Sequence, residues 1–194
     1  MTFYAQIFVF LFSFPMLMIT QRGEGSPASN AISKIEKKHM LKQFHDHGFV
    51  CSNIGGGGDG TRFKHLTIGF NTREILNVKT ARKYIVEGVI KFINEINQTS
   101  GAKDHFTQWP FEFSKLTYRI NVHVNNGVWP KFPNGPTEDQ KISYVSMRKG
   151  IINYYIDVQP RKLPESIHCE TLEDAIAILK AEGWTEPEPS IDNK

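Results

Sequence analysis

The residues from Leu116 to Val124 alternate between apolar and polar side chains, and this feature restricts the fold most strongly. The apolar positions are Leu116, Tyr118, Ile120, Val122 and Val124. Successive side chains of a strand point to opposite faces, so this pattern predicts a strand with one buried face and one solvated face. Asn125-Asn126-Gly127 follows directly and is typical of a tight turn. A half-buried strand that turns back on itself favours an antiparallel sheet.

The remaining periodicity supplies helices and further strands around that segment. The elements expected in chain order are a helix over 31–47, strands over 49–54 and 63–70, a helix over 78–97, strands over 116–124, 128–132, 142–147 and 151–158, and a helix over 171–183. Strands joined by tight turns predict an α+β domain, with an antiparallel sheet of about five to six strands and two or three helices packed on one face.

The helix expected over 78–97 has the clearest apolar face in the chain. That face is formed by Ala81, Ile85, Val89, Phe92, Ile93 and Ile96, and the charged residues that fall mostly elsewhere are Arg82, Lys83, Glu87, Lys91 and Glu95. For the last helix, Thr171 followed by Asp174 is typical of a capping box. Both helices should therefore cover the sheet with one side and face water with the other.

Composition excludes several classes of protein. The chain has 194 residues, 40% hydrophobic and 22% charged, so it can bury a core without a metal or several disulfides. A formal charge of +3 is too small to indicate nucleic acid. The seven histidines show no spacing that would fix a metal ion. We therefore expect no metal, no cofactor and no nucleic-acid partner.

The first nineteen residues carry no charged side chain, and residues 3–19 are mostly apolar. Such a block predicts export, with residues 1–25 as a signal peptide or, if uncleaved, an N-terminal membrane anchor. A single α+β domain over 26–185 and a disordered tail over 186–194 complete the expected organisation. The expected location is periplasmic or secreted, with contact to a membrane only through residues 3–19.

A run of glycines from Gly55 to Gly60, broken by Asp59, supports two interpretations. Its expected form is a flexible loop between two strands. Alternatively, the backbone N–H groups of Gly55, Gly56, Gly57 and Gly58 could cradle an anion with help from Arg62 and Lys64. No G-K-[ST] sequence follows, and the next residues look like a strand. The alternative function is therefore an anionic-ligand binder or hydrolase with its site at this loop.

Aromatic residues and prolines gather in two irregular segments. They include Trp109 and Phe111 in the first and Trp129 and Phe132 in the second. Exposed aromatic loops suit a protein partner, whereas folded-back loops anchor themselves on the core. The favoured function is a small exported, non-enzymatic protein-binding module that uses these four side chains.

Cys51 and Cys169 are the only cysteines. They could form one disulfide in an exported chain, or remain two separate thiols. No G-x-S-x-G elbow is present, and neither cysteine has a histidine placed by sequence for nucleophilic catalysis. We therefore name no catalytic residue and do not expect an enzyme.

The central stretch combines a glycine run, a helix of characteristic sequence and an aromatic link before a strand. Its elements are Gly55–Gly58, Leu66-Thr67-Ile68-Gly69-Phe70, Thr80-Ala81-Arg82 with Ile85-Val86, Phe92 and Ile96-Asn97, Trp109-Pro110-Phe111, and Tyr118-Arg119-Ile120. Together they resemble a family of small uncharacterised exported proteins from chlamydia-like bacteria, over approximately residues 40–180. Lys79-Thr80 replaces the acidic start of the family's helix, and Gln108-Trp109 replaces the tyrosine of its aromatic link. The resemblance implies one exported domain and transfers no catalytic residue.

Overall fold

The computed structural model describes residues 48–59, 61–122, 141–156 and 164–187, which form an α+β fold with one six-stranded mixed sheet and two α-helices. The elements are β1 (Phe49–Gly58), β2 (Phe63–Thr72), α2 (Val78–Gln98), two short 3-10 helices (Ala102–His105 and Phe113–Lys115), β3 (Leu116–Val122), β4 (Tyr144–Arg148), β5 (Ile151–Ile156), β6 (Glu165–Thr171) and α3 (Leu172–Ala181).

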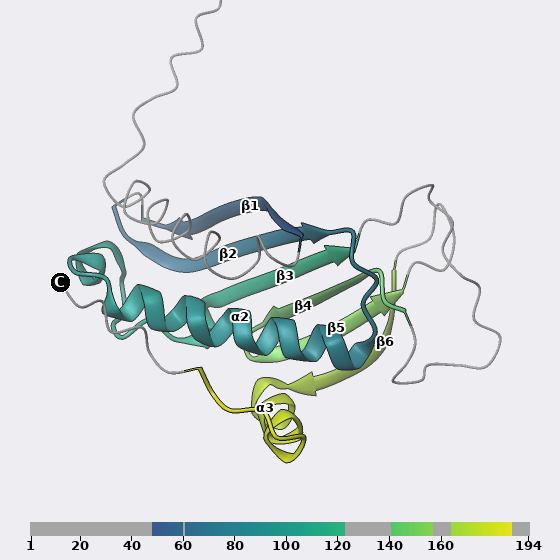
Figure 1. Cartoon of the computed structure of the whole chain (residues 1–194). Coiled ribbons are helices and arrows are strands. Elements are labelled where there is room, and N and C mark those ends of the chain that lie inside the picture. The colour runs from purple at the N-terminus through teal and green to yellow at the C-terminus, as the bar shows by residue number, and fades with distance from the viewer. Residues whose placement is uncertain (1–47, 60, 123–140, 157–163, 188–194) are drawn as a thin grey trace, which may run out of the picture.

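The six strands lie side by side in the order in which they occur in the sequence, from β1 to β6 (Figure 1). Four of the five strand pairs are antiparallel, which confirms the predicted fold class, and β2 and β3 are parallel. The parallel pair departs from the expected antiparallel pairing, and so does the other neighbour of β3, which is β4 and not a strand directly after the expected turn Asn125–Gly127. The helix α2 connects β2 to β3, and a crossover of this length returns the chain to the starting end of the sheet, so that the two strands run the same way.

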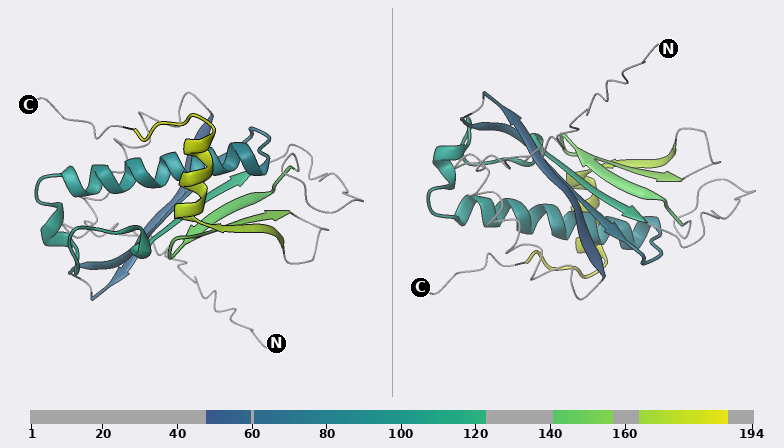
Figure 2. Two further views of the ribbon diagram at one scale, coloured as in Figure 1. Left: turned by 90° about the horizontal axis from the view of Figure 1, so that it is seen from below. Right: turned by 90° about the horizontal axis from the view of Figure 1, so that it is seen from above.

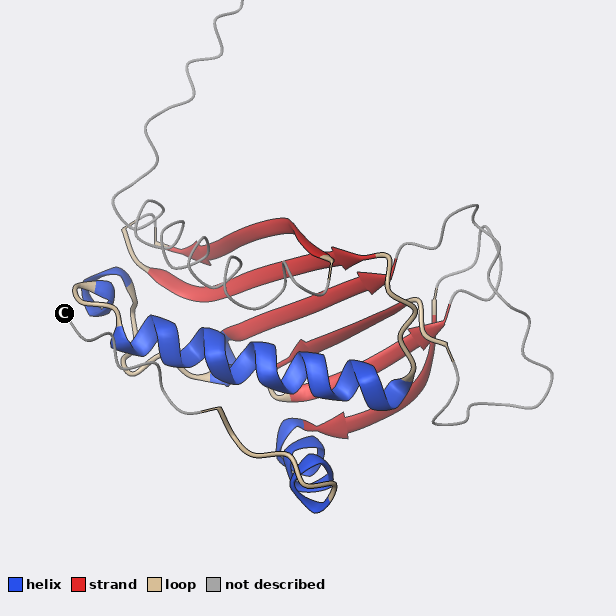
Figure 3. Cartoon of the chain, in the orientation of Figure 1, coloured by secondary structure: helices blue, strands red, loops and turns tan. Residues whose placement is uncertain are grey.

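The core lies between the sheet and α2, which crosses one face of it (Figure 3). Leu66, Ile68 and Ile120 on the strands and Ile85 and Val89 on the helix are fully buried. The shorter helix α3 follows β6 directly and lies beyond that strand, beside α2 (Figure 2). One sheet edge is therefore flanked by a helix.

The sheet face away from α2 carries polar and aromatic side chains. Asn121 donates to the Asn71 side chain at 2.9 Å. The Tyr144 and Tyr155 rings stack with their centroids 4.2 Å apart. This two-sidedness is what the alternation along β3 predicts.

Both helices begin with side-chain caps. Asn77 accepts from the Thr80 backbone N–H at 2.8 Å, and the Thr80 hydroxyl accepts from the Asn77 N–H at 3.0 Å. Thr171 accepts from the Asp174 N–H at 3.0 Å, which confirms the expected start of the last helix. Such bonds satisfy N–H groups that have no partner within a helix.

Several expected segments lie outside the described residues. These are the apolar segment 3–19, the helix over 31–47, the turn Asn125–Gly127, the strand over 128–132 and most of the tail. Within the part of the chain that the structure describes, no helix combines the length and apolarity needed to cross a membrane.

Candidate functional site

The glycine run lies in a strand and not in a flexible loop. Gly55–Gly58 are the last four residues of β1 and pair with β2. The connection to β2 is a short turn in which the Asp59 carboxylate accepts from the N–H groups of Thr61 at 3.1 Å and Arg62 at 2.9 Å. These bonds, led by that from Arg62, lower the pKa of Asp59 to about 2. The expectation of an irregular loop is wrong, because pairing with β2 and this turn hold the segment extended.

Three of these four glycines have close neighbours within the chain. A Cβ atom at Gly56 would overlap the Phe63 ring, and one at Gly57 would overlap the His65 ring. At Gly58 it would overlap the Arg62 carbonyl oxygen. A ring on a neighbouring strand that covers a glycine compensates for the side chain that glycine lacks. Gly55 differs, because a Cβ there meets no atom within 4 Å.

The alternative interpretation, an anion site at Gly55–Gly58, requires a helix after the loop. In this structure the strand β2 follows instead. Arg62 and Lys64 are both exposed, Arg62 in the turn and Lys64 on β2. Gly55 to Gly58 belong to a ladder whose N–H groups alternate in direction, so they do not converge on one point. The run therefore lacks the converging N–H groups and helix dipole by which such loops bind phosphate.

The strand that contains the run forms one edge of the sheet. β1 has β2 on one side, and no described strand lies on the other. Its ten residues, FVCSNIGGGG, include no charged residue and no proline. Edge strands are commonly protected by charges, prolines or bulges, because their unpaired N–H and C=O groups can pair with another chain.

The opposite edge, β6, is different. It is shorter, at seven residues, and carries Glu165, His168 and Glu170. The helix α3 also flanks it (Figure 2). Of the two edges of the described sheet, only β1 is long and uncharged.

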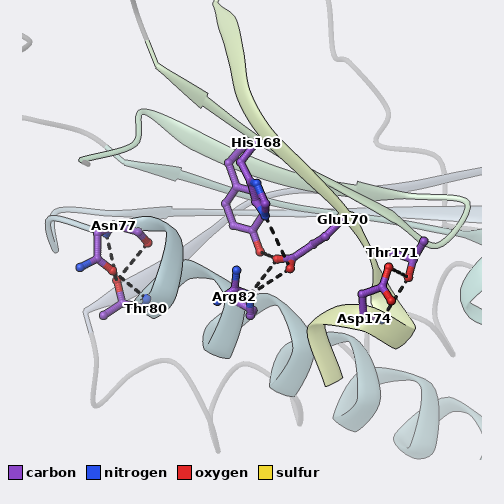
Figure 4. A network of polar contacts seen from close by, with 8 residues as sticks. Asn77, Thr80, Arg82, His168, Glu170, Thr171 and Asp174 are labelled. Atoms are coloured by element: carbon purple, nitrogen blue, oxygen red, sulfur yellow. Dashed lines mark hydrogen bonds and ion pairs between the residues drawn. The ribbon is translucent and has the colours of Figure 1, made fainter. Parts of the chain in front are cut away.

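A buried polar cluster ties α2 to the β5–β6 side of the sheet (Figure 4). The Arg82 Nε–H donates to the two Glu170 carboxylate oxygens at 2.9 and 3.1 Å, and the Tyr154 hydroxyl donates to the same carboxylate. The Arg82 and Glu170 side chains are 3% and 5% exposed. Burial first, and then the bond to Glu170, raise the pKa of Tyr154 well above its usual range. The placement of Arg82 outside the apolar face is therefore wrong.

His168 lies at the surface end of this cluster. Its Nε2 atom is 3.6 Å from the Glu170 carboxylate, and its side chain is 41% exposed. The next residue, Cys169, points to the other face of the sheet, as successive strand residues do. Within the described ranges, no group of three or more potential ligands could hold a metal ion.

The residues of the first aromatic segment lie against the core. Phe111 is 3% exposed, and both its N–H and its C=O bond to the Asn97 side chain, at 2.8 and 3.0 Å. Trp109 is half-buried, with its ring 6.0 Å from that of Phe106. Phe111 therefore has no surface to offer a partner, and its predicted partner-binding role is replaced by a core role. Trp129 and Phe132 lie outside the described residues.

The two cysteines lie at opposite edges of the sheet, and neither forms a disulfide. Cys51 is on β1 and Cys169 is on β6. Five strand spacings of about 4.8 Å separate these strands by roughly 24 Å. A disulfide allows its Cα atoms a separation of about 7 Å at most, so of the two alternatives the structure has two separate thiols and no Cys51–Cys169 bond within one chain.

Comparison of the chain with models of protein families, with curated proteins and with solved structures gives no significant match. The geometry of the chain's own residues therefore has to support any functional argument.

Proposed function

We propose that this protein is a non-enzymatic protein-binding module, and that a partner contributes an extended segment that pairs with the outer edge of β1. The observation that carries this proposal is the composition of that edge, which has no charged residue and no proline. In such recognition, main-chain hydrogen bonds supply the affinity and neighbouring side chains supply selectivity.

The bulges of β1 define which part of the edge can accept a strand. Register shifts occur between Cys51 and Asn53 and again between Gly57 and Gly58. A bulge bends its strand and interrupts pairing. The regular stretch between them is Asn53–Gly57, so the partner segment pairs over about five residues.

Substitution of Gly55 tests this proposal, since a side chain there meets no atom within 4 Å. We propose Gly55→Lys, which places a charge on the edge, and Gly55→Ser as the neutral control. The full chain is immobilised, and partners are captured from an extract of the cells that make it. We expect Gly55→Lys to capture at least about five-fold less partner than Gly55→Ser, which corresponds to roughly 1 kcal/mol of binding.

Circular dichroism and thermal unfolding establish that both variants are folded. Equal capture by the lysine and serine variants would contradict the proposal, because an edge used for strand pairing cannot be indifferent to a charge at its centre. Capture that depends on Trp129 and Phe132, and not on Gly55, would instead favour the aromatic segments.

We also propose that the chain is exported. What supports this is the uncharged, mostly apolar segment over residues 3–19. Mass spectrometry of the mature N-terminus tests it, and an intact Met1 on protein from a soluble fraction would contradict both cleavage and anchoring.

A further inference from the structure

The centre of the regular stretch of β1 is Gly55. Asn53, Ile54, Gly55, Gly56 and Gly57 pair in unbroken register with Gly69, Ile68, Thr67, Leu66 and His65 of β2. Side chains therefore occupy the first two positions, and glycines occupy the last two. Gly55 therefore separates two residues that have side chains, Asn53 and Ile54, from two glycines, Gly56 and Gly57.

Gly55 is the glycine in the run at which an added side chain would meet no other atom. At Gly56 and Gly58 an added Cβ would overlap the backbone carbonyl oxygens of His65 and Arg62, and at Gly57 it would displace the His65 ring. At Gly55 an added Cβ meets no atom within 4 Å, and no positive φ makes a side chain unfavourable there. A glycine within a strand weakens it and often marks a place where another backbone approaches closely.

We infer that the strand paired with β1 is β1 of a second copy of this chain, antiparallel to the first about a two-fold axis at Gly55. This inference rests on the proposed function, and it names the partner. The axis places Gly55 opposite Gly55 of the second copy. It also places Asn53 opposite Gly57, and Ile54 opposite Gly56.

This register is complementary in shape and brings no charges together. Each side chain in the first half of the stretch faces a glycine of the other copy, so it meets the ring of Phe63 or His65 that covers that glycine and not a second β1 side chain. The stretch holds no charged residue, so no like charges meet across the axis. An interface in which one surface patch meets itself is the form that two-fold dimers take. The two sheets thereby become one continuous sheet.

Cysteine crosslinking at the axis tests the register. The full chain is prepared with Cys51→Ser and Cys169→Ser, and with Gly55→Cys as its only thiol. Residues directly opposite in an antiparallel pair have Cα atoms about 4.5 to 5.5 Å apart, within the range of a disulfide. We expect mild oxidation to convert most of the Gly55→Cys protein to a covalent dimer within minutes. A Ser166→Cys control on β6 should remain monomeric.

Opposite charges at the axis give a second test that needs no oxidation. Light scattering after size exclusion should show the wild type at twice the monomer mass, and Gly55→Lys and Gly55→Glu each as monomers. An equimolar mixture of these two variants should recover the dimer, because only in the mixed pair does the introduced ammonium face the introduced carboxylate across the axis.

The inference is overturned if the wild type stays monomeric at high micromolar concentration and Gly55→Cys crosslinks no faster than Ser166→Cys. The proposed function survives that outcome if Gly55→Lys still captures less partner from the extract than Gly55→Ser. If capture is also unchanged, both proposals fail.

Discussion

At the scale of single residues, the contact expected to affect the stability of the fold most is the buried ion pair between Arg82 and Glu170. Both side chains are almost completely buried, and their mutual attraction opposes the cost of removing two charges from water. Replacing such a pair with apolar groups is often neutral, whereas removal of one partner leaves an uncompensated buried charge. We therefore expect replacement of both Arg82 and Glu170 by apolar residues to destabilise the fold less than removal of either one alone.

We predict that Glu170→Ala lowers the free energy of unfolding by about 3 to 5 kcal/mol, because it removes one charge of a buried ion pair. Denaturant unfolding measures this, with Glu173→Ala as an exposed control in the first turn of α3. The double variant Arg82→Met/Glu170→Met should lose much less than the sum of the losses of Arg82→Met and Glu170→Met measured singly. Additive losses would show that the two side chains do not act as a pair.

Tyrosine burial predicts a loss of stability in alkaline solution. Burial raises the pKa of Tyr118 and of Tyr154 above the usual range, and it raises that of Tyr84 to about 12. Above pH values of about 10 the unfolded chain releases these protons while the folded chain keeps them, so the free energy of unfolding falls as pH rises. Below that pH the contribution is fully present.

The measurement is chemical unfolding at pH values from about 9 to about 11.5, in wild type and in Tyr154→Phe. Each group adds a slope of about 1.4 kcal/mol per pH unit between its unfolded and folded pKa values, so Tyr154→Phe should have a shallower decline by up to that amount. An unchanged slope would exclude Tyr154 as one of the titrating groups.

The sequence held a signal for the buried arginine. Val78, Arg82, Ile85 and Val89 follow one another at helical spacing, so Arg82 belongs to the apolar stripe of α2 by position. What the sequence could not supply was the partner, because Glu170 lies 88 residues further along and is brought near only by the sheet. A charged residue within an apolar stripe predicts a partner without identifying it.

At the scale of elements, the start of α2 depends on a reciprocal pair of hydrogen bonds between Asn77 and Thr80. We predict that Asn77→Ala lowers the free energy of unfolding by about 1 kcal/mol, within the range of roughly 0.5 to 2 kcal/mol typical of lost caps. Asn77→Asp retains an acceptor for the Thr80 N–H and serves as the control. If alanine and aspartate destabilise equally in thermal unfolding, the cap contributes nothing specific.

Hydrophobic periodicity predicts some elements and not others. It predicts an element whose own side chains form the buried face, and it misses an element that depends on contacts with residues distant in the sequence. Along α2 and β3 the apolar pattern itself forms the buried face, so both were predictable. In β6, Ile167 is the only large apolar side chain, and the strand forms because it pairs with β5 and because Glu170 meets Arg82. The glycine run is extended for a similar reason, since β2 supplies both its ladder and the rings of Phe63 and His65.

At the scale of the whole molecule, the strands lie in the sheet in the order in which they occur in the sequence. The helix α2 belongs to the connection between β2 and β3, all of which the structure describes. The sequence predicted the class of the fold because alternating strands and amphipathic helices define it. It could not predict the parallel pair, which depends on where α2 returns the chain. Nor could it identify β1 as an edge, although the candidate binding site follows from that position.

The order of strands also predicts the redox behaviour of the chain, because it places Cys51 and Cys169 on the two outermost strands of the described sheet. Protein kept under oxidising conditions and unfolded in alkylating reagent without reductant should take up two alkyl groups per monomer. Its mobility in a denaturing gel should not change on reduction. A monomer mass lower by two hydrogens, without alkylation, would require the edges of one sheet to meet and would contradict the strand order itself. No disulfide within the chain is therefore expected under oxidising or reducing conditions, and the stability of the fold has to come from its core rather than from a crosslink.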